Sequence, residues 1–512
     1  MLVKTALLIV SNPNNIGKIL VNIQEKVKKT LYIQLLSAVT GPLAFHSNLF
    51  TSAPKYSKLI WGIYSQAAEY CEGLDIQVLL SAFKNANLAK IRTRNTVELI
   101  IFDKLYDDAE VVGFLKGRVE NVTSNCRVIT FNEAMSTIAL PCATDERVYK
   151  HAVLGGTFDR LHIAHKILLS EAALRSSCKL TVGVTDKNML YGKTLWELVE
   201  PLQNRLKGVE NFIKDVCPEL ETNIVPIQDL YGPTQHDPTM ELLILSAETT
   251  RGGQKINEVR EIKGLPKLDI FQVDLIEEPH RNPVEETKIS SSTNRIRLLG
   301  TLLKAPLTNI VISTPYVIGL TGGIASGKSN ISLRLKELGA EVIDCDKVAH
   351  KLYEPNKRCF ELVVEHFGRS IVSGDGRIDR KILGSIVFKS SEQLQKLNSL
   401  VWPAIIEDVN DCIQKSSAKV VVVDAAVLVQ AGWDKYCHEV WTSIISKDIA
   451  VERLKSRNGL TEEQALERIA SQLSNETYVN SANVVFCSQW EKEFTFSQVD
   501  KAWTLLQERL LQ

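Results

Sequence analysis

Apolar and polar positions alternate with two different periods along the first 147 residues of the 512-residue chain. Apolar runs at 5–10 and 96–103 predict β-strands, and helical spacing of apolar residues at 16–27 and 55–73 predicts amphipathic helices. This mixture predicts an α/β region, and no motif within it indicates a chemistry. The polar segment 143–150 predicts a linker at its end.

A second region repeats the alternation of strand and helix. Residues 151–177 predict a strand, a glycine turn and a helix, and residues 179–185 predict the strand that follows. We therefore expect a βαβ unit with a parallel sheet and a right-handed crossover. The pattern continues to about residue 303, and residues 301–309 predict a second linker.

The last region contains apolar runs at 316–322, 340–346 and 419–428, and the second and third of these contain aspartates. Strands that are apolar on both faces and lead into carboxylates are typical of a parallel sheet, whose ligands bind at the carboxyl ends of the strands. The fold class predicted for the chain is therefore α/β with parallel sheets. The expected domains cover residues 1–147, 148–305 and 310–512.

Lys and Arg number 60 and Asp and Glu number 60, so the net charge is zero. A neutral chain lacks the cationic field of a nucleic-acid coat or of a polybasic membrane binder. The ten cysteines form no C-x-x-C pair, which disfavours zinc-ribbon and thioredoxin functions and favours a reducing compartment. Glycine and proline interrupt the uncharged stretches 30–54 and 305–327, so we expect no transmembrane segment. We also expect no secretory signal, while the late first acidic residue, Glu25, leaves organelle targeting open.

The strongest motif is "GGIASGKS", in which Gly322, Gly327, Lys328 and Ser329 have the spacing of a phosphate loop. Binding phosphate requires successive backbone N–H groups that point into one concavity, glycines leave that approach open, and the following helix adds the positive end of its dipole. We expect Lys328 to reach the β and γ phosphates of ATP and Ser329 to hold Mg²⁺. The ATP-binding residues expected here are Gly322, Gly323, Ile324, Ala325, Ser326, Gly327 and Ser329.

Carboxylates after the next strands complete a candidate kinase site. Asp344 and Asp346 are two positions apart and are expected to share one face of a strand end. Asp344 is the candidate that accepts the proton of the phosphoryl-acceptor hydroxyl. Asp424 is either a magnesium ligand acting through water or part of a structural turn. The charged helical pair 450–473 predicts a lid, for which the candidate arginines, each with a solvated surface role as the alternative, are Arg453, Arg457 and Arg468.

Together these elements resemble dephospho-CoA kinase over most of residues 316–512. The segments that carry the resemblance are "GLTGGIASGKS", "IDCDKVAH", "RKILGSIVF", "LNSLVWPAI" and "RLKSRNGLTEEQALERIASQ". The resemblance implies that Asp344 activates the ribose 3′-hydroxyl of dephospho-CoA for attack on the γ-phosphate of ATP. Trp402 stands where many members have His, and the segment 484–490 lacks the usual Asn. Both departures concern contacts with the substrate or adenine.

The middle region has a second signature, "GGTFDRLHIAH". It places His162 and His165 three positions apart at the start of a helix, and therefore on one face. Two imidazoles at a helix N-terminus meet the charge that nucleotidyl transfer develops on the α-phosphate and on pyrophosphate. Gly155 and Gly156 let a nucleotide approach the backbone, and Thr157 is a further residue expected to bind ATP. A zinc site would need the Glu of H-E-x-x-H, which is missing.

Three downstream segments complete this candidate site. The segment "KISSSTNRIR" offers hydroxyls at a predicted helix start and Arg295, which suits the β and γ phosphates, while an N-capped helix with a surface Arg is the alternative. The segment 186–193 supplies Lys187 and Lys193, of which we favour Lys193 for an acceptor phosphate. The remaining ATP-binding residues expected here are Ser246, Glu248, Thr249, Ser290, Ser291 and Ser292.

Residues 151–300 resemble the Rossmann-like HxGH nucleotidyltransferases, and "GGTFDRLHIAH" with "LSAETTRGGQKIN" resembles phosphopantetheine adenylyltransferase of the archaeal and eukaryotic type. The resemblance implies that 245–257 holds adenine and ribose and that a lysine binds the phosphate of 4′-phosphopantetheine. Ala164 replaces the glycine of the motif, and we expect its methyl group to narrow the nucleotide pocket without abolishing activity.

In this order, the two regions resemble the bifunctional coenzyme A synthases of animals. The resemblance implies a transferase that converts 4′-phosphopantetheine and ATP to dephospho-CoA, and then phosphorylates dephospho-CoA to CoA, with Mg²⁺ as cofactor. The alternatives are a nicotinamide-mononucleotide adenylyltransferase fused to a ribosylnicotinamide kinase, and a scaffold with one degenerate site. We expect a cytoplasmic enzyme and leave open mitochondrial association, oligomeric state and a protein partner for residues 1–147.

Overall fold

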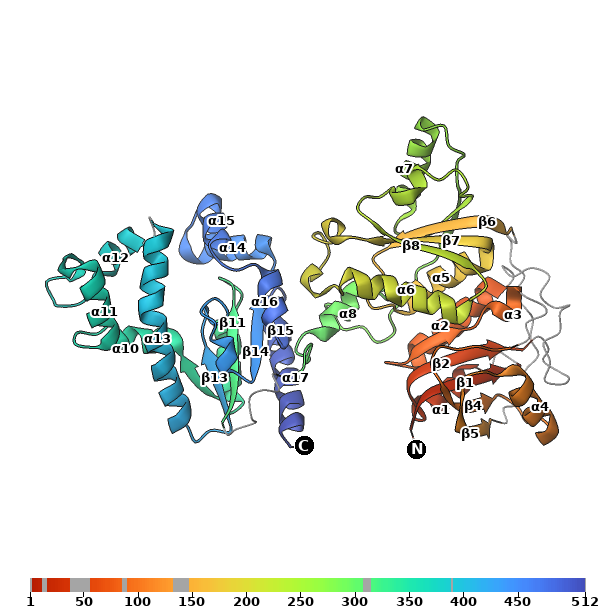
Figure 1. Ribbon diagram of the computed structural model, residues 1–512, viewed down its shortest axis with the longest axis horizontal. Coiled ribbons are helices and arrows are strands. Elements are labelled where there is room, and N and C mark those ends of the chain that lie inside the picture. Colours follow the sequence, from red (N-terminus) through yellow and green to blue (C-terminus); the bar gives the residue numbers. More distant parts are fainter. Residues whose placement is uncertain are drawn as a thin grey trace. The chain divides into compact units, whose positions relative to one another are not determined.

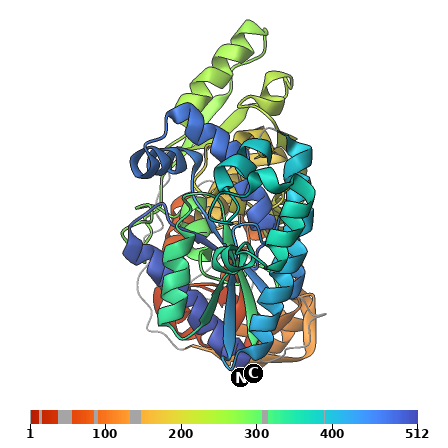
Figure 2. The ribbon, with the colours of Figure 1, turned by 90° about the vertical axis from the view of Figure 1, so that its left-hand side faces the viewer.

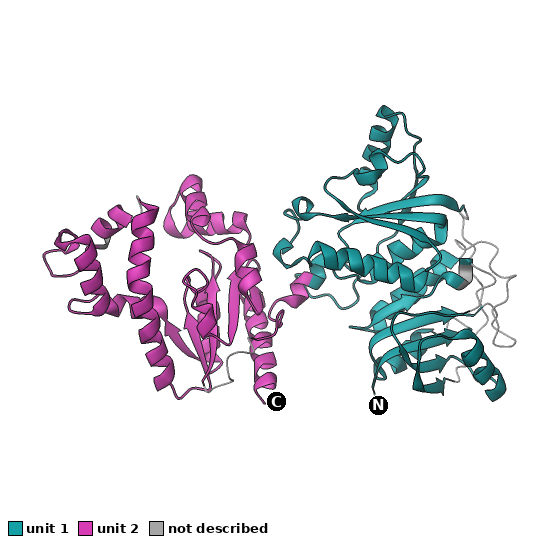
Figure 3. Ribbon diagram, in the orientation of Figure 1, with its two compact units in different colours: residues 1–294 teal, residues 295–512 magenta. Residues whose placement is uncertain are grey.

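The computed structural model describes residues 2–11, 16–36, 56–84, 90–131, 147–306, 315–387 and 390–511. Residues 143–146 and 307–309 of the two expected linkers lie outside these ranges. The chain divides into two compact units, Met1–Asn294 and Arg295–Gln512 (Figure 3). Each unit is a parallel-sheet α/β structure, and the first contains two sheets. Among the described residues, none of the helices has the length and apolarity that crossing a bilayer would require.

The N-terminal sheet of the first unit has five parallel strands in the order β3-β2-β1-β4-β5. Its central strand is buried on both faces because every residue from Ala6 to Val10 is apolar and inaccessible to solvent. The predicted strands and helices of this region are confirmed. The elements are β1 (Val3–Val10), α1 (Ile16–Gln24), β2 (Val27–Leu35), α2 (Ser57–Tyr70), β3 (Asp75–Val78), α3 (Ser81–Lys84), β4 (Val97–Phe102), α4 (Asp108–Arg118) and β5 (Val122–Thr130).

The second sheet of this unit has the order β10-β9-β6-β7-β8 and is also parallel. The expected βαβ unit is confirmed by β6, α5 and β7. Because β6 pairs with β7 on one side and β9 on the other, its carboxyl end is a topological switch point, where such sheets bind ligands. The elements are β6 (Tyr149–Gly156), α5 (Ile163–Arg175), β7 (Ser176–Thr185), η3 (Lys187–Met189), η4 (Trp196–Leu198), α6 (Leu202–Val216), β8 (Glu221–Ile227), η5 (Gly232–Gln235), β9 (Leu242–Ser246), α7 (Thr250–Ile262), β10 (Asp269–Val273) and α8 (Ser291–Leu298), which crosses the unit boundary.

The two sheets of the first unit share one hydrophobic core. Buried residues of α1 and α2 belong to the same apolar cluster as buried residues of α5 and α6. Figure 1 shows α2, in orange, lying next to α5, and these helices are in contact. The N-terminal region and the second sheet therefore form one compact unit with a shared core rather than two separate domains.

The second unit contains a five-stranded parallel sheet in the order β12-β13-β11-β14-β15. Apolar clusters cover both of its faces, and Figure 2 shows helices on either side of the strands. The elements are β11 (Tyr316–Gly322), α9 (Lys328–Glu337), β12 (Glu341–Asp344), α10 (Cys345–Leu352), α11 (Arg358–Phe367), η6 (Arg369–Ile371), α12 (Arg380–Val387), α13 (Ser391–Lys415), β13 (Val420–Asp424), η7 (Asp434–Tyr436), β14 (Glu439–Ile444), α14 (Lys447–Asn458), α15 (Glu462–Ala470), α16 (Asn475–Ser481), β15 (Val484–Cys487) and α17 (Lys492–Leu510).

Candidate active sites

The glycine motif of the second unit forms the turn between β11 and α9. Gly322 has φ 153° and Gly327 has φ 83°, which are conformations that side chains disfavour. A Cβ at Gly322 would lie 2.5 Å from the carbonyl oxygen of Ser443, so a side chain at this position would clash with the protein backbone. A Cβ at Gly323, by contrast, would meet nothing closer than 3.7 Å. Open space at Gly323 is where a phosphate can approach the backbone.

Side chains from distant elements hold this loop. The carbonyl oxygen of Ser326 accepts hydrogen bonds from the hydroxyls of Ser443 (2.6 Å) and Ser488 (2.7 Å). The amide of Ile324 donates to Oε1 of Gln472 at 2.7 Å. These supports were not predictable from the sequence, because a buried serine at a strand end has no distinctive spacing. The Ser326 hydroxyl itself is buried and finds no hydrogen-bond partner among the described residues, which suits a loop that binds an anion.

Lys328 forms an ion pair with Asp424, and both side chains are largely buried. Asp424 ends β13, where its register partners are Asp344 of β12 and Leu320 of β11. The three strand ends therefore gather Lys328, Asp344 and Asp424 at one edge of the sheet, as the sequence analysis expected. Ser329 follows Lys328 and is exposed.

The expectation that Asp344 and Asp346 share a strand face is wrong. Strand β12 ends at Asp344 and α10 begins at Cys345, so Asp346 lies in the first turn of a helix and is exposed. The Asp344 carboxylate caps this helix by accepting from the Lys347 amide at 3.1 Å. Burial alone would raise the pKa of Asp344, but hydrogen bonds and the charge from Lys347 outweigh it and lower that pKa. Asp344 is therefore ionised at neutral pH and able to accept a proton.

The predicted charged helical pair is confirmed as α14 and α15. Gly459 ends α14 in a left-handed conformation, and Thr461 with Gln464 forms a capping box at the start of α15. Arg453 donates to the carbonyl oxygen of Ala325 (2.9 Å) and to the Ser488 hydroxyl (2.8 Å), so it contacts the phosphate loop. The other candidate arginines, Arg457 and Arg468, are exposed.

The described residues contain no cluster of three or more His, Cys, Asp or Glu that could enclose a metal. Mg²⁺ does not require such a cage, because it retains several waters and binds through one or two protein oxygens plus substrate phosphates. A hydroxyl at Ser329 and a carboxylate at Asp424 fit that donor set.

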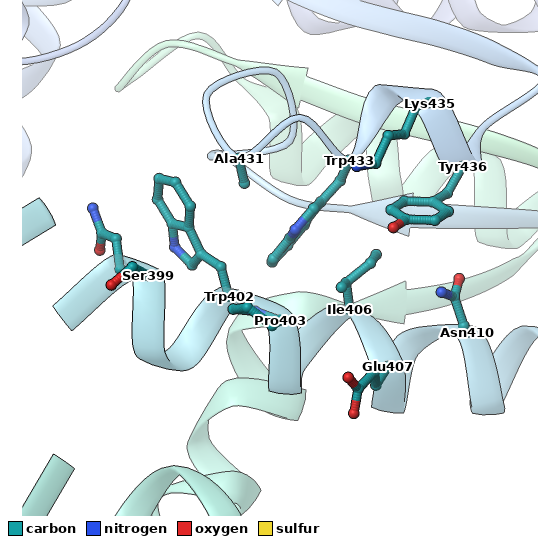
Figure 4. Close-up of a pocket in the computed structure, with 11 residues that line it drawn as sticks. Ser399, Trp402, Pro403, Ile406, Glu407, Asn410, Ala431, Trp433, Lys435 and Tyr436 are labelled. Atoms are coloured by element: carbon teal, nitrogen blue, oxygen red, sulfur yellow. The ribbon is translucent and has the colours of Figure 1, made fainter. Parts of the chain in front are cut away.

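Trp402, the departure from the kinase pattern, lines a pocket of about 320 Å³ on α13. Figure 4 shows the Trp402 ring facing the Trp433 side of this pocket, with Tyr436 farther along. The pocket therefore has aromatic walls, while Glu407 and Lys435 add charges at its edge. The Trp402 side chain packs against the apolar core of the second unit and also lines this pocket.

In the first unit, His162 and His165 stack against each other at the start of α5. Their ring centroids are 3.7 Å apart and the ring planes differ by 21°. His162 is the extended residue that precedes the helix, and His165 lies in its first turn. Nε2 of His162 lies 3.2 Å from the Ser291 hydroxyl, which also donates to the carbonyl oxygen of Asp159. The fold thus brings the "KISSS" segment to the histidines, as expected.

His165 is partly buried and remains uncharged at neutral pH. Burial lowers its pKa to about 3, the Lys193 charge also lowers this pKa, and the Asp159 carboxylate opposes them. A neutral imidazole donates or accepts one hydrogen bond on each nitrogen and carries no charge. His165 therefore suits hydrogen bonding to a phosphate better than proton shuttling near pH 7.

Arg205 holds the turn that leads to these histidines. It is buried, and it donates to the carbonyl oxygens of Thr157 (2.8 Å), Thr185 (2.8 Å) and Glu200 (2.9 Å). These bonds join the carboxyl ends of β6 and β7 to the start of α6. The role of Arg205 was not predictable from the sequence, because an arginine in an amphipathic helix ordinarily faces solvent.

Lys288 was not among the site residues that the sequence predicted. It pairs with Glu248, which brings the segments 245–257 and 288–297 together. Burial lowers the pKa of Lys288, and the nearby Lys193 charge lowers that pKa further. The two lysines therefore lie close to each other in this candidate site. Lys187 lies exposed in η3.

The remaining candidates lie at the end of β9 and on α8. Ser246 ends β9, with its hydroxyl 3.3 Å from that of Thr249. The Ser290 hydroxyl accepts from the Thr293 amide at 3.1 Å and so caps α8. Ser292 is half-buried in the first turn of α8, and Arg295 is buried on the same helix.

The protonation of His165 predicts a pH-dependent stability. The unfolded chain protonates this ring near pH 6.5, whereas the folded protein does so only near pH 3. Stability is therefore fully present above about pH 6.5 and is lost as the pH falls towards 3. Between pH 7.5 and 5.5, the free energy of unfolding of the wild type should fall by roughly 1.4 kcal/mol more than that of His165→Asn. Hydrogen exchange of peptides from β6 and α5 measures this difference, and equal losses in the two proteins would contradict it.

A site with a phosphate loop, a lid and strand-end carboxylates defines a phosphate-loop kinase. The family model described as dephospho-CoA kinase matches residues 316–491, and the model described as cytidylyltransferase-like matches residues 153–297. The dephospho-CoA kinase of Fusobacterium nucleatum is 38% identical over 185 residues, which cover 36% of this chain and 95% of that protein. The Geobacillus kaustophilus dephospho-CoA kinase is 37% identical over 196 residues, covering 37% and 98%.

A solved dephospho-CoA kinase from Campylobacter jejuni is 25% identical and covers 37% of this chain and 96% of that one, with a TM-score of 0.30. Through its second unit, the chain belongs to the dephospho-CoA kinase family. Its first unit adds a cytidylyltransferase-like region and an N-terminal α/β region. These findings support a fusion of the coenzyme A synthase kind.

Proposed function

We propose that the chain catalyses the last two steps of coenzyme A synthesis. In the first, the phosphate of 4′-phosphopantetheine attacks the α-phosphate of ATP, which yields dephospho-CoA and pyrophosphate. In the second, the ribose 3′-hydroxyl of dephospho-CoA attacks the γ-phosphate of another ATP, which yields CoA and ADP. The supporting observation is the pairing of a dephospho-CoA kinase unit with a stacked-histidine nucleotidyltransferase-like site whose product would be the kinase's substrate.

At the kinase site, Asp344 would accept the proton of the 3′-hydroxyl, since its lowered pKa keeps it ionised. Lys328 would exchange its partner Asp424 for the β and γ phosphates. Mg²⁺, when bound at Ser329 and Asp424, would neutralise the phosphate charge. The aromatic pocket lined by Trp402 would bind part of the dephospho-CoA molecule.

At the adenylyl-transfer site, His162 and His165 would donate hydrogen bonds to the phosphates as charge moves onto pyrophosphate. Lys193 would bind the phosphate of 4′-phosphopantetheine, and Ser291 and Arg295 would contact the leaving phosphates. The methyl group of Ala164 packs against the hydrophobic core, which supports a tolerated substitution for the motif's glycine. We place this enzyme in the cytoplasm, with a mitochondrial association left open.

Product analysis tests the whole proposal. The full-length protein is given ATP, Mg²⁺ and 4′-phosphopantetheine, and products are identified by mass over time. Dephospho-CoA should appear first and CoA should follow. A parallel reaction with nicotinamide mononucleotide should yield no dinucleotide. Formation of that dinucleotide, or failure to form dephospho-CoA, would contradict the adenylyl-transfer assignment.

Ser488 links the lid arginine to the phosphate loop, and its removal should weaken ATP use. Ser488→Ala removes the hydroxyl that donates to Ser326 and accepts from Arg453. A hydrogen bond to a charged group contributes about 1.5–3 kcal/mol, so kcat/KM for ATP in the kinase step should fall roughly tenfold or more. Steady-state kinetics with added dephospho-CoA measures this effect. Ser497→Ala, at an exposed position on α17, is the control and should leave the kinetics unchanged.

A further inference from the structure

Helix α5 of the first unit buries charged residues along its length. Lys166, Glu171 and Arg175 are only 4%, 6% and 2% exposed. Charged side chains are rarely buried unless each has a partner, so a helix with this pattern must be covered by a complementary surface. The covering surface of α5 includes residues of the N-terminal region, which has no activity assigned to it.

The contacts run along the whole helix. Nζ of Lys166 donates to the Asp75 carboxylate (2.5 Å) and to the Ile76 carbonyl oxygen (2.9 Å), both on β3. The Ser57 hydroxyl of α2 donates to Glu171 at 2.9 Å. At the far end, the Lys84 ammonium donates to the carbonyl oxygen of Ala173 at 2.8 Å. The N-terminal region thus contacts the first, middle and last turns of α5.

Helix α6 is held in the same way. Its buried Asp215 accepts from the Tyr32 hydroxyl (3.0 Å) and from the backbone amide (2.7 Å) and Nε (3.1 Å) of Arg94. The opposite end of α6 carries Arg205, which fixes the carbonyl oxygens of Thr157 and Thr185. Each helix therefore reaches the candidate site with its first turns and is anchored in the N-terminal region.

Lys166 has the most direct connection to the candidate site. It follows His165 in the chain, and its amide donates to the carbonyl oxygen of His162 at 3.1 Å. Any rotation of the first turn of α5 would move both rings, whose stacking depends on their mutual orientation. A fixed ammonium one residue from His165 restrains that rotation.

We propose that the N-terminal region is a positioning platform for adenylyl transfer, and that Lys166, anchored by Asp75 and Ile76, is a positioning residue for His162 and His165. This inference rests on the adenylyl transfer proposed above. It assigns the described part of the N-terminal region a role in catalysis at a distance, through its contacts with α5 and α6. Misplacing a reacting group by about 1 Å costs up to a hundredfold in rate, so a small rotation is sufficient.

The test compares Lys166→Met, which keeps the aliphatic stem, with Lys214→Met, which breaks an exposed ion pair on α6. For Lys166→Met, kcat of adenylyl transfer should fall ten- to a hundredfold while KM for ATP changes little. Phosphorylation of added dephospho-CoA by the same protein should be unchanged, and it reports that the second unit is folded. Lys214→Met should match wild type in both steps.

Nuclear magnetic resonance of the histidine rings separates positioning from stability. In Lys166→Met, measured well below the unfolding temperature, the ring-proton signals of His162 and His165 should shift because their stacking changes. Unchanged ring-proton signals together with an unchanged kcat would contradict the proposed positioning role of Lys166 and the N-terminal region. If Lys166→Met does not fold, Asp75→Asn and Lys84→Met decide the question by the same criteria. If wild type makes no dephospho-CoA, the proposed function fails, while the ring signals still test the platform.

Discussion

Lys328→Ala is expected to stop the second reaction, so that dephospho-CoA accumulates from 4′-phosphopantetheine and ATP. Lys328 begins α9 and pairs with Asp424 at the edge where three strand ends meet. Alanine removes the ammonium that would neutralise the β and γ phosphates, and it leaves the Asp424 carboxylate to repel them. Losing one such electrostatic contact costs about 10²–10³-fold in kcat. Chromatography with mass detection measures both CoA and dephospho-CoA.

The matched control is Lys336→Ala, which removes an exposed lysine from the last turn of the same helix. It should form CoA at the wild-type rate. The first reaction should proceed normally in both variants, because His162 and His165 lie in the other unit. Normal CoA formation by a folded Lys328→Ala protein would show that the phosphate loop is not the site of the second reaction.

The sequence was most informative where a site is built from consecutive residues. The loop from Gly322 to Ser329 was predictable because glycines, Lys and Ser stand in one short motif between a strand and a helix. The expected one-face pairing of Asp344 and Asp346 failed because Asp344 caps a helix, so the chain turns helical at the next residue. Residues two positions apart share a face only while the strand continues.

Residues that support a site from a distance were not predictable. Ser443 and Ser488 bond to Ser326 from 117 and 162 positions away in the sequence. No sequence pattern around a serine predicts such a contact. Lys166 and Arg205 stand in helical segments where charged residues ordinarily face solvent. The packing of the N-terminal region against α5 explains why Lys166 is buried, and the carbonyl oxygens at the ends of β6 and β7 explain why Arg205 is buried.

His165→Ala is expected to abolish formation of dephospho-CoA while added dephospho-CoA is still converted to CoA. The His165 ring is stacked on His162 and partly buried, and its pKa of about 3 makes it a neutral hydrogen-bonding group at neutral pH. Alanine removes that group and leaves His162 without its stacking partner. A fall of about 10²–10³-fold in kcat is therefore expected.

The control for this variant is His236→Ala, at an exposed position of the same unit, which should behave like wild type. His165→Asn separates two roles, since asparagine retains a donor but not the ring. Recovery of part of the rate in His165→Asn would identify the hydrogen bond as the main contribution, and no recovery would identify the stacked geometry. If a folded His165→Ala protein lost both reactions, the second unit would depend on the first, and two independent sites could no longer describe the chain.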